Sequence, residues 1–334
     1  MREYYRPQVQ LGAQRPPNSL LICGGKFWFD QVEVITRSGS LGYRHVKEFP
    51  PQFFDEITRR RAALSNLNFK QPIIMGIVNL TPDSFSDGGD IKTLEDFSIK
   101  VNSLINAGAK IIDIGGESTR PGALEVSLVE EKKRVFEPLK WLSKIDHDTV
   151  VSLDTRKSEI AEMASSLNVK IINDVSGASF DENMLRVASK KNFYICLCHS
   201  VRTPETMSEN PVYDNVLLDV YDKLERRVKR AQDTGVPKDH ILIDPGIGFG
   251  KKNEHNLVLI KNISIFHNLG CPIVLGVSRK KFIKTNFTTY EDSDLDVGSI
   301  FYSLEGIRQG VQIVRVHNVS TMMKCLNGFK ALWS

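Results

Sequence analysis

Polar side chains recur at the ends of short apolar runs along this 334-residue chain. Amides and carboxylates end five of these runs, at Asn79, Asp113, Asp154, Asn173 and Asp244. Such groups can pair with the N–H donors and ring acceptors of a flat heterocycle, for example an amino-pyrimidinone edge. These residue types therefore indicate a binding site for a heterocyclic ligand.

Cationic side chains and a histidine end the last two apolar runs. Ser278, Arg279 and Lys280 follow the seventh run, and Arg315 and His317 end the eighth. Arginine and lysine suit an anion, most simply a phosphate or a diphosphate. A site with acceptors on one side and cations on the other suits a phosphorylated heterocycle.

These residues need a scaffold that brings strand ends together. The apolar runs predict buried strands at 72–78, 110–114, 150–153, 169–172, 193–197, 240–243, 272–277 and 313–316. Longer segments with helical periodicity, such as 127–145 and 213–235, lie between them. Eight alternating units over about 260 residues predict an α/β protein with a parallel (β/α)₈ barrel, whose active site lies at the carboxyl ends of its strands. An open, doubly wound sheet is the alternative, and it is disfavoured because no GxGxxG follows the first strand.

The composition limits the classes of function. The net charge of +4 gives no basis for nucleic-acid binding. No run of 18 apolar residues occurs, so we expect no membrane span, and the first residues lack the apolar core of a secretory signal. Five cysteines without a CxxC spacing favour the reducing cytoplasm.

Seven segments carry a resemblance to a known family. They are TPDSFSDGG (81–89), IIDIGGESTRPGA (111–123), SLDTRK (152–157), INDVSG (172–177), DPGIGFGK (244–251), GVSRKKFI (276–283) and VRVHNV (314–319). In this order they resemble dihydropteroate synthase, from residue 72 to about residue 325. The resemblance implies a (β/α)₈ barrel that joins 4-aminobenzoate to 6-hydroxymethyl-7,8-dihydropterin diphosphate in folate synthesis. Pyrophosphate would be released with the assistance of Mg²⁺, and these small molecules, rather than nucleic acid or a membrane, would be the partners.

The resemblance also implies roles for individual residues. The pterin contacts fall on Asp113, Asp154, Asn173, Asp244, Lys280 and Arg315. The diphosphate contacts fall on Asn79, Arg315 and His317, of which Asn79 would also contact the metal. The 4-aminobenzoate contacts fall on Thr119, Pro121, Phe249 and Ser278, below two mobile loops that carry Ser84, Phe85 and Arg120. Catalysis would rest on Asp113, Lys280, Arg315 and His317.

Two alternatives to a working synthase stay open. One is a degenerate homologue that binds pterin or a partner protein without turnover, because Cys198 stands where the family usually has a methionine packed on the pterin. The other is a methyltetrahydrofolate-binding methyltransferase, for which the loops TPDSFSDGG and STRPG have no use. A homodimer is also open, although the helix expected at 298–310 carries Phe301, Tyr302 and Glu305 where the family tends to place alanines.

Residues 1–70 form an extension before the pterin-binding barrel of residues 71–334. Within it, 27–37 predicts a strand and 51–67 predicts an amphipathic helix. The family has a short hairpin at the bottom of the barrel, and we expect 20–37 to supply it.

Overall fold

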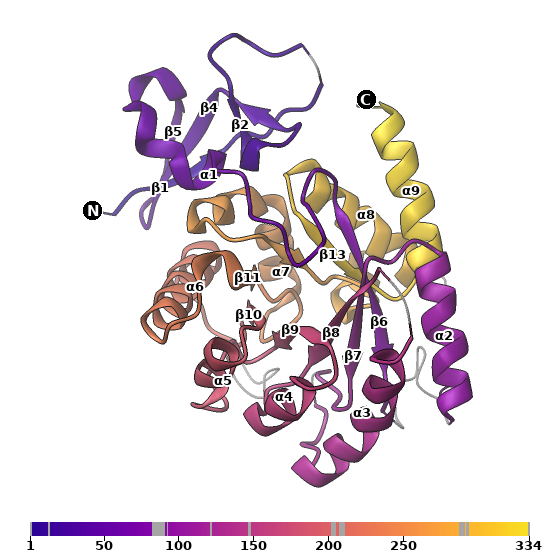
Figure 1. The fold of residues 1–334 in the computed structure, drawn as a ribbon. Coiled ribbons are helices and arrows are strands. Elements are labelled where there is room, and N and C mark those ends of the chain that lie inside the picture. The colour runs from indigo at the N-terminus through magenta and orange to yellow at the C-terminus, as the bar shows by residue number, and fades with distance from the viewer. Residues whose placement is uncertain are drawn as a thin grey trace.

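Eight parallel strands form a barrel in the computed structural model of this chain (Figure 1). The structure describes residues 2–12, 14–81, 91, 93–120, 122–145, 148–201, 205–206, 211–286, 291 and 294–332. The strands follow the order β11-β10-β9-β8-β7-β6-β13-β12, and a parallel bridge between Ile243 and Ile273 joins the two ends of this order. The (β/α)₈ prediction is therefore confirmed, and the open doubly wound sheet is wrong.

The barrel strands lie close to their predicted positions. They are β6 (Ile73–Asn79), β7 (Ile111–Gly115), β8 (Val150–Asp154), β9 (Val169–Asp174), β10 (Tyr194–Cys198), β11 (Ile241–Asp244), β12 (Val274–Leu275) and β13 (Ile313–Val316). Only β12 is much shorter than predicted. The chain leaves the sheet at Gly276 and turns toward Lys280, whose N–H donates to the carbonyl of Val277 at 3.4 Å.

Helices cover the outside of the barrel. They are α2 (Leu94–Asn106), α3 (Leu128–Leu142), α4 (Ser158–Ala164), α5 (Met184–Lys190), α6 (Val216–Asp233), α7 (Asn253–Lys261), α8 (Asp294–Arg308) and α9 (Val319–Leu332), with the 3₁₀-helices η4 (Lys238–His240), η5 (Ile263–Leu269) and η6 (Lys281–Asn286). The two predicted helices, now α3 and α6, begin after Ser127 and Asn215, whose side chains accept backbone N–H groups of the first turn. Helix α6 ends at Asp233, and Gly235 follows with a φ of +94°. No helix among the described residues is long and apolar enough to cross a membrane.

Apolar side chains fill the lower part of the barrel interior. The inward-facing residues are Ile73, Met75, Ile111, Val150, Ile171, Cys196, Leu242, Val274 and Ile313. Leu64 packs against this cluster from below and is only 2% exposed. Two backbone hydrogen bonds of 2.8 and 2.9 Å join Leu64 and Leu67 into a turn. The turn at 64–67 therefore closes the bottom of the barrel. We expected 20–37 to supply a hairpin there, and part of that segment lies beside this end, where the amide of Gln312 donates to Sγ of Cys23 at 3.4 Å.

The extension has a small core of its own. Strands β1 (Tyr4–Pro7), β4 (Gln31–Thr36) and β5 (Gly39–His45) form one antiparallel sheet, and β2 (Leu20–Leu21) pairs with β3 (Trp28–Phe29). The remaining elements are η1 (Ile22–Gly24), η2 (Val46–Glu48), η3 (Pro51–Phe54) and α1 (Asp55–Thr58). The strand predicted at 27–37 is thus split between β3 and β4. The helix predicted at 51–67 is wrong beyond Thr58, because the chain becomes extended at Arg59 (ψ 126°) and runs on to the turn at 64–67.

The extension is tied to one side of the barrel (Figure 1). Arg37 pairs with Asp219 and Asp222 on α6 at 2.8 and 2.7 Å. The side-chain amide of Asn268 on η5 donates to the carbonyl of Tyr5 at 2.7 Å. These contacts join the extension to the elements around β11 and β12, while the domain boundary at residue 70 stays a prediction.

Candidate active site

Arg315 bridges two carboxylates at the carboxyl end of the barrel. Its Nε donates to Oδ2 of Asp113 at 2.6 Å, and its Nη2 donates to Oδ2 of Asp154 at 2.8 Å. Alternation along β13 turns Arg315 inward, as it does Ile313 below it. Burial raises the pKa of Asp154 to about 8. The charge of Arg315 lowers this pKa, whereas the charge of Asp113 raises it further. One cation thus faces two buried carboxylates.

Asp113 also accepts hydrogen bonds from the two strands beyond its own. The hydroxyl of Ser152 on β8 donates to Oδ1 at 2.6 Å, and the amide of Asn173 on β9 donates to Oδ2 at 3.0 Å. Sequence reasoning missed Ser152, although it lies two residues before Asp154 and therefore on the same face of the strand. The structure brings Asp113, Asp154, Asn173 and Arg315 together, as the strand ends predicted.

Lys280 lies across the mouth from this group. Its ammonium donates to the carbonyl of Ile247 and lies 3.9 Å from the ring centroid of Phe249. Burial lowers the pKa of Lys280 to about 8, although the charge of Asp244 acts in the opposite direction. Burial also raises the pKa of Asp244, which accepts the N–H of Gly246 at 2.7 Å.

His317 is paired with Ser278. The Ser278 hydroxyl oxygen accepts the backbone N–H of His317 at 3.1 Å and lies 2.9 Å from its Nδ1. The hydroxyl proton can therefore go to Nδ1, which leaves the ring proton on Nε2. Burial, with the charges of Arg279, Arg315 and Arg120, holds the pKa of His317 well below its usual value. His317 is thus a neutral N–H donor rather than a cation.

Arg279 does not join the other cations of the site. Its guanidinium pairs with the carboxylate of Asp296 on α8 at 2.7 and 3.0 Å, and its N–H donates to Ser299 at 2.8 Å. These contacts hold α8 against the segment after β12. Arg279 therefore helps to hold α8 in place, and its charge acts on His317.

A small cavity of about 20 Å³ lies between the carboxylates and Lys280. Of the predicted site residues, it is lined by Thr119, Asp154, Asn173, Asp244, Phe249, Lys280 and Arg315. Cys198, at the position where the family usually has a methionine, also lines it. A flat heterocycle needs more room than this, so we expect Arg315 or Lys280 to move when a ligand enters.

Some of the other predicted site residues lie near this cavity, and some are not among the described residues. Asn79 is half-buried at the end of β6, opposite Gly115 of β7. Arg120 is exposed, yet its charge acts on His317. Pro121, Ser84 and Phe85 lie outside the described residues.

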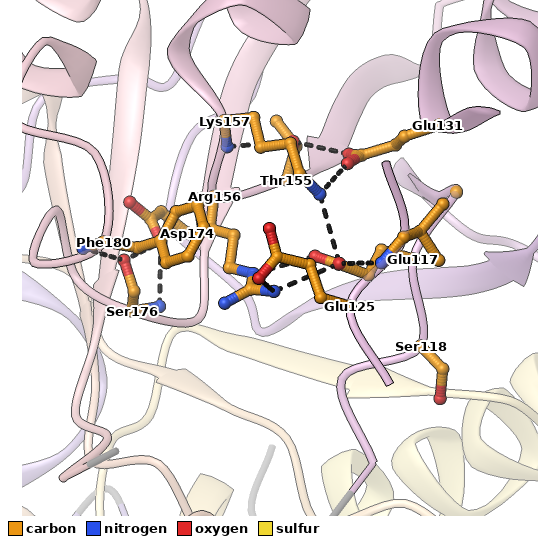
Figure 2. A network of polar contacts seen from close by, with 12 residues as sticks. Glu117, Ser118, Glu125, Glu131, Thr155, Arg156, Lys157, Asp174, Ser176 and Phe180 are labelled. Atoms are coloured by element: carbon orange, nitrogen blue, oxygen red, sulfur yellow. Dashed lines mark hydrogen bonds and ion pairs between the residues drawn. The ribbon is translucent and has the colours of Figure 1, made fainter. Parts of the chain in front are cut away.

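A buried ionic network holds the loop that leads to Thr119 (Figure 2). Glu117, two residues after β7, accepts two hydrogen bonds from Arg156 at 2.8 and 3.1 Å and pairs with Lys157 at 3.1 Å. Lys157 also pairs with Glu131 on α3 at 2.6 Å. Two buried cations thus balance two buried carboxylates between the loop after β7 and the loop after β8.

The network reaches further into the loop. The N–H of Val126 donates to Glu117 at 2.8 Å, so both ends of segment 117–126 meet at one carboxylate. Burial alone would raise the pKa of Glu117, but Arg156, the N–H of Val126 and Lys157 lower it. Arg156 also lies 3.9 Å from the ring centroid of Phe180. Sequence reasoning assigned no role to Glu117, Arg156 or Lys157, although charged residues just after two adjacent strands were a usable signal.

Comparison with known proteins places this fold and site in a family. The family model described as pterin binding enzyme matches residues 75–317. Dihydropteroate synthase of Escherichia coli K12 is 37% identical over 270 residues, which are 81% of this chain and 95% of that protein. The structure of the Yersinia pestis dihydropteroate synthase with a sulfonamide drug complex matches with a TM-score of 0.76 at 33% identity. This match covers 81% of this chain and 99% of the Yersinia pestis chain. The structure of the Xanthomonas albilineans dihydropteroate synthase with 4-aminobenzoic acid matches with a TM-score of 0.73 at 34% identity. This match covers 80% of this chain and 94% of the Xanthomonas albilineans chain. The chain therefore belongs to the pterin-binding enzyme family and, within it, to the dihydropteroate synthases.

Proposed function

We propose that the protein condenses 6-hydroxymethyl-7,8-dihydropterin diphosphate with 4-aminobenzoate to form 7,8-dihydropteroate and pyrophosphate in folate biosynthesis. The observation that carries this proposal is the buried group of Arg315, Asp113, Asp154 and Asn173 at the mouth of the barrel. It offers acceptors for an amino-pyrimidinone edge and a cation for an anion in one place.

The buried carboxylates would bind the pterin ring. Asp154 and Asp244 are buried acids whose pKa values are raised by burial, so an N–H donor from a ligand would stabilise their charged forms. The amide of Asn173 adds a donor and an acceptor beside them. Lys280 would close the pterin site from the side of Phe249.

The reaction breaks the bond between the pterin methylene carbon and the diphosphate oxygen. Positive charge then develops on the pterin methylene group, near Asp113 and Asp154, and the electron pair leaves with the diphosphate. Arg315 and the Nε2–H of His317 would stabilise the charge on the leaving group. The amine of 4-aminobenzoate attacks the methylene carbon and then loses a proton. Thr119, Phe249 and Ser278 would hold its ring and carboxylate.

Asn79, at the end of β6, has a side-chain amide oxygen that could contact Mg²⁺. The described residues contain no group of three or more His, Cys, Asp or Glu side chains arranged for a metal ion. This arrangement fits an ion held mainly by substrate phosphates and water, as is usual for Mg²⁺. When bound, the ion would neutralise part of the charge on the diphosphate.

Two further expectations belong to this proposal. All five cysteines are free, which supports the expected cytoplasmic location. A homodimer stays open, because α8, the helix of the family's usual interface, is atypical in this chain. Phe301 on this helix is 63% exposed, whereas Tyr302 packs on Phe282 with ring centroids 5.2 Å apart.

The direct test mixes the two substrates with the purified protein and follows both products. With both substrates present we expect equal amounts of pyrophosphate and dihydropteroate. Arg315→Lys should lower kcat by about 10²–10³-fold, because it removes the forked contact to the carboxylates. Arg308→Lys, which changes a surface pair with Glu305 on α8, is the matched control. Pterin binding without pyrophosphate release would instead identify a degenerate homologue.

A further inference from the structure

A cavity of about 580 Å³ lies at the end of the barrel opposite the polar site. Pro72 and Gln312, which directly precede β6 and β13, form its floor. The last turns of α9 form one side, and the first part of the extension forms the other. Its volume is that of a site for a drug-sized small molecule.

The wall of this cavity is apolar and incompletely covered. Leu11, Leu21 and Phe27 come from the extension and are only half-buried. Phe69 and Phe329 face the same cavity and are also half-buried. Apolar side chains gathered in one hollow favour a ligand that removes them from water.

The charges around the cavity have one sign. Arg15, Lys26, Lys70 and Lys330 line it, and none of the described residues that line it is an aspartate or a glutamate. Lys330 donates to the side-chain oxygen of Gln71 at 2.5 Å, so its described contact is neutral. Burial and the nearby charge of Lys26 lower the pKa of Lys330. The two lysines therefore repel each other, and an anion between them would relieve the repulsion.

We infer that this cavity binds a small organic carboxylate, with the apolar body against the phenylalanine and leucine side chains and the carboxylate between Lys26 and Lys330. The site depends on the extension, because Leu11, Leu21, Phe27 and Lys26 all precede residue 75, where the family match begins. The Escherichia coli synthase has no counterpart of comparable length, because 95% of that protein matches only 81% of this chain.

Calorimetry on the full chain tests the inference without any assay of activity. The probes are two matched pairs, 4-phenylbutyrate with 4-phenylbutyramide and octanoate with octanamide. At least one carboxylate should bind with a 1:1 stoichiometry and at least about tenfold more tightly than its neutral amide. The carboxylate that binds more tightly shows whether the cavity prefers an aromatic or an aliphatic ligand. Equal affinity for carboxylate and amide, or no binding of either carboxylate, would overturn the inference.

Variants locate the binding event. Lys330→Gln should weaken carboxylate binding about tenfold, and Leu21→Trp should also weaken it, because the larger ring narrows the cavity. Lys324→Gln is the matched control, because Lys324 is exposed on the same helix and does not line the cavity. Thermal unfolding without ligand identifies any variant that has not folded. Binding that survives both Lys330→Gln and Leu21→Trp unchanged, or binding only to phosphatidylglycerol vesicles, would contradict the inference.

Discussion

Arg315 and Asp113 form an ion pair 2.6 Å long inside the mouth of the barrel, between strands β13 and β7 that are separated by β6. The same guanidinium reaches Asp154 on β8 at 2.8 Å. Arg315 therefore compensates two carboxylates that are both out of water. Removal of Arg315 should therefore lower the stability of the fold by an amount that depends on whether those carboxylates are charged.

The stability of an Arg315→Met variant should depend on pH. With Arg315 present the pKa of Asp154 is raised to about 8, although the charge of Arg315 lowers it, so the pKa should be higher still in the variant. Below pH 8 the folded carboxyl is neutral in both proteins, whereas above pH 8 only the variant must hold a proton that the unfolded chain has lost, and only the variant loses further stability. A folded-state pKa above the unfolded one gives stability that is lost as the pH rises through the folded value. We expect urea unfolding to show a loss of about 3–5 kcal/mol at pH 9 and a smaller loss at pH 6. A loss that is equal at both pH values would contradict this account.

Activity should fall on the alkaline side as Lys280 loses its proton. Burial lowers the pKa of Lys280 to about 8, so its ammonium is lost progressively above that pH. The pH profile of kcat/KM for the pterin substrate should therefore decline above about pH 8. Lys280→Arg keeps the charge at higher pH, so its residual activity should show a flatter alkaline limb. An identical limb in wild type and variant would assign the decline to another group.

His317 should act as a neutral donor. Burial and the charges of Arg279, Arg315 and Arg120 hold its pKa well below the usual value, so its protonation should add no limb to the profile at or above neutral pH. His317→Ala should weaken the diphosphate substrate by about tenfold or more and leave a pterin without phosphates unaffected. His317→Gln, which retains an N–H donor, should lose less. Equal losses for both ligands would mean that His317 acts through folding and not through the anion.

The strands and the polar strand ends could be predicted because each rests on local sequence. An apolar run that ends in Asp113 or Asn173 needs no distant information, and closure of the barrel then places both side chains in one mouth. The pairing of Ser278 with His317 could not be predicted, because it depends on the path of the chain after β12, which ends at Leu275, earlier than predicted. The helix at 51–67 failed for a related reason. The apolar spacing of this segment continues past Thr58, but Leu64 packs against the side chains of the barrel interior and is not on a helix.

Glu117 should be required for stability and for 4-aminobenzoate binding. Glu117→Ala leaves Arg156 and Lys157 buried with one carboxylate fewer, so we expect a loss of about 3–5 kcal/mol in urea unfolding. The KM for 4-aminobenzoate should rise because Thr119 loses its anchored loop. Glu125→Ala is the matched control, since that side chain is 53% exposed and pairs with Arg156 at 3.5 Å. Its cost should stay below about 1 kcal/mol. Equal effects of the two variants would show that the network does not position the loop.

The buried carboxylates at the barrel mouth should bind the pterin ring. Calorimetry with a pterin ligand measures this directly on wild type, Asp154→Ala and Asp244→Ala. Asp233→Ala is the control, because Asp233 is exposed at the end of α6 and pairs only loosely with Lys229 at 3.4 Å. We predict that each site variant binds pterin about ten- to a hundredfold more weakly, while the control is unchanged. Wild-type affinity in folded Asp154→Ala and Asp244→Ala would contradict the claim.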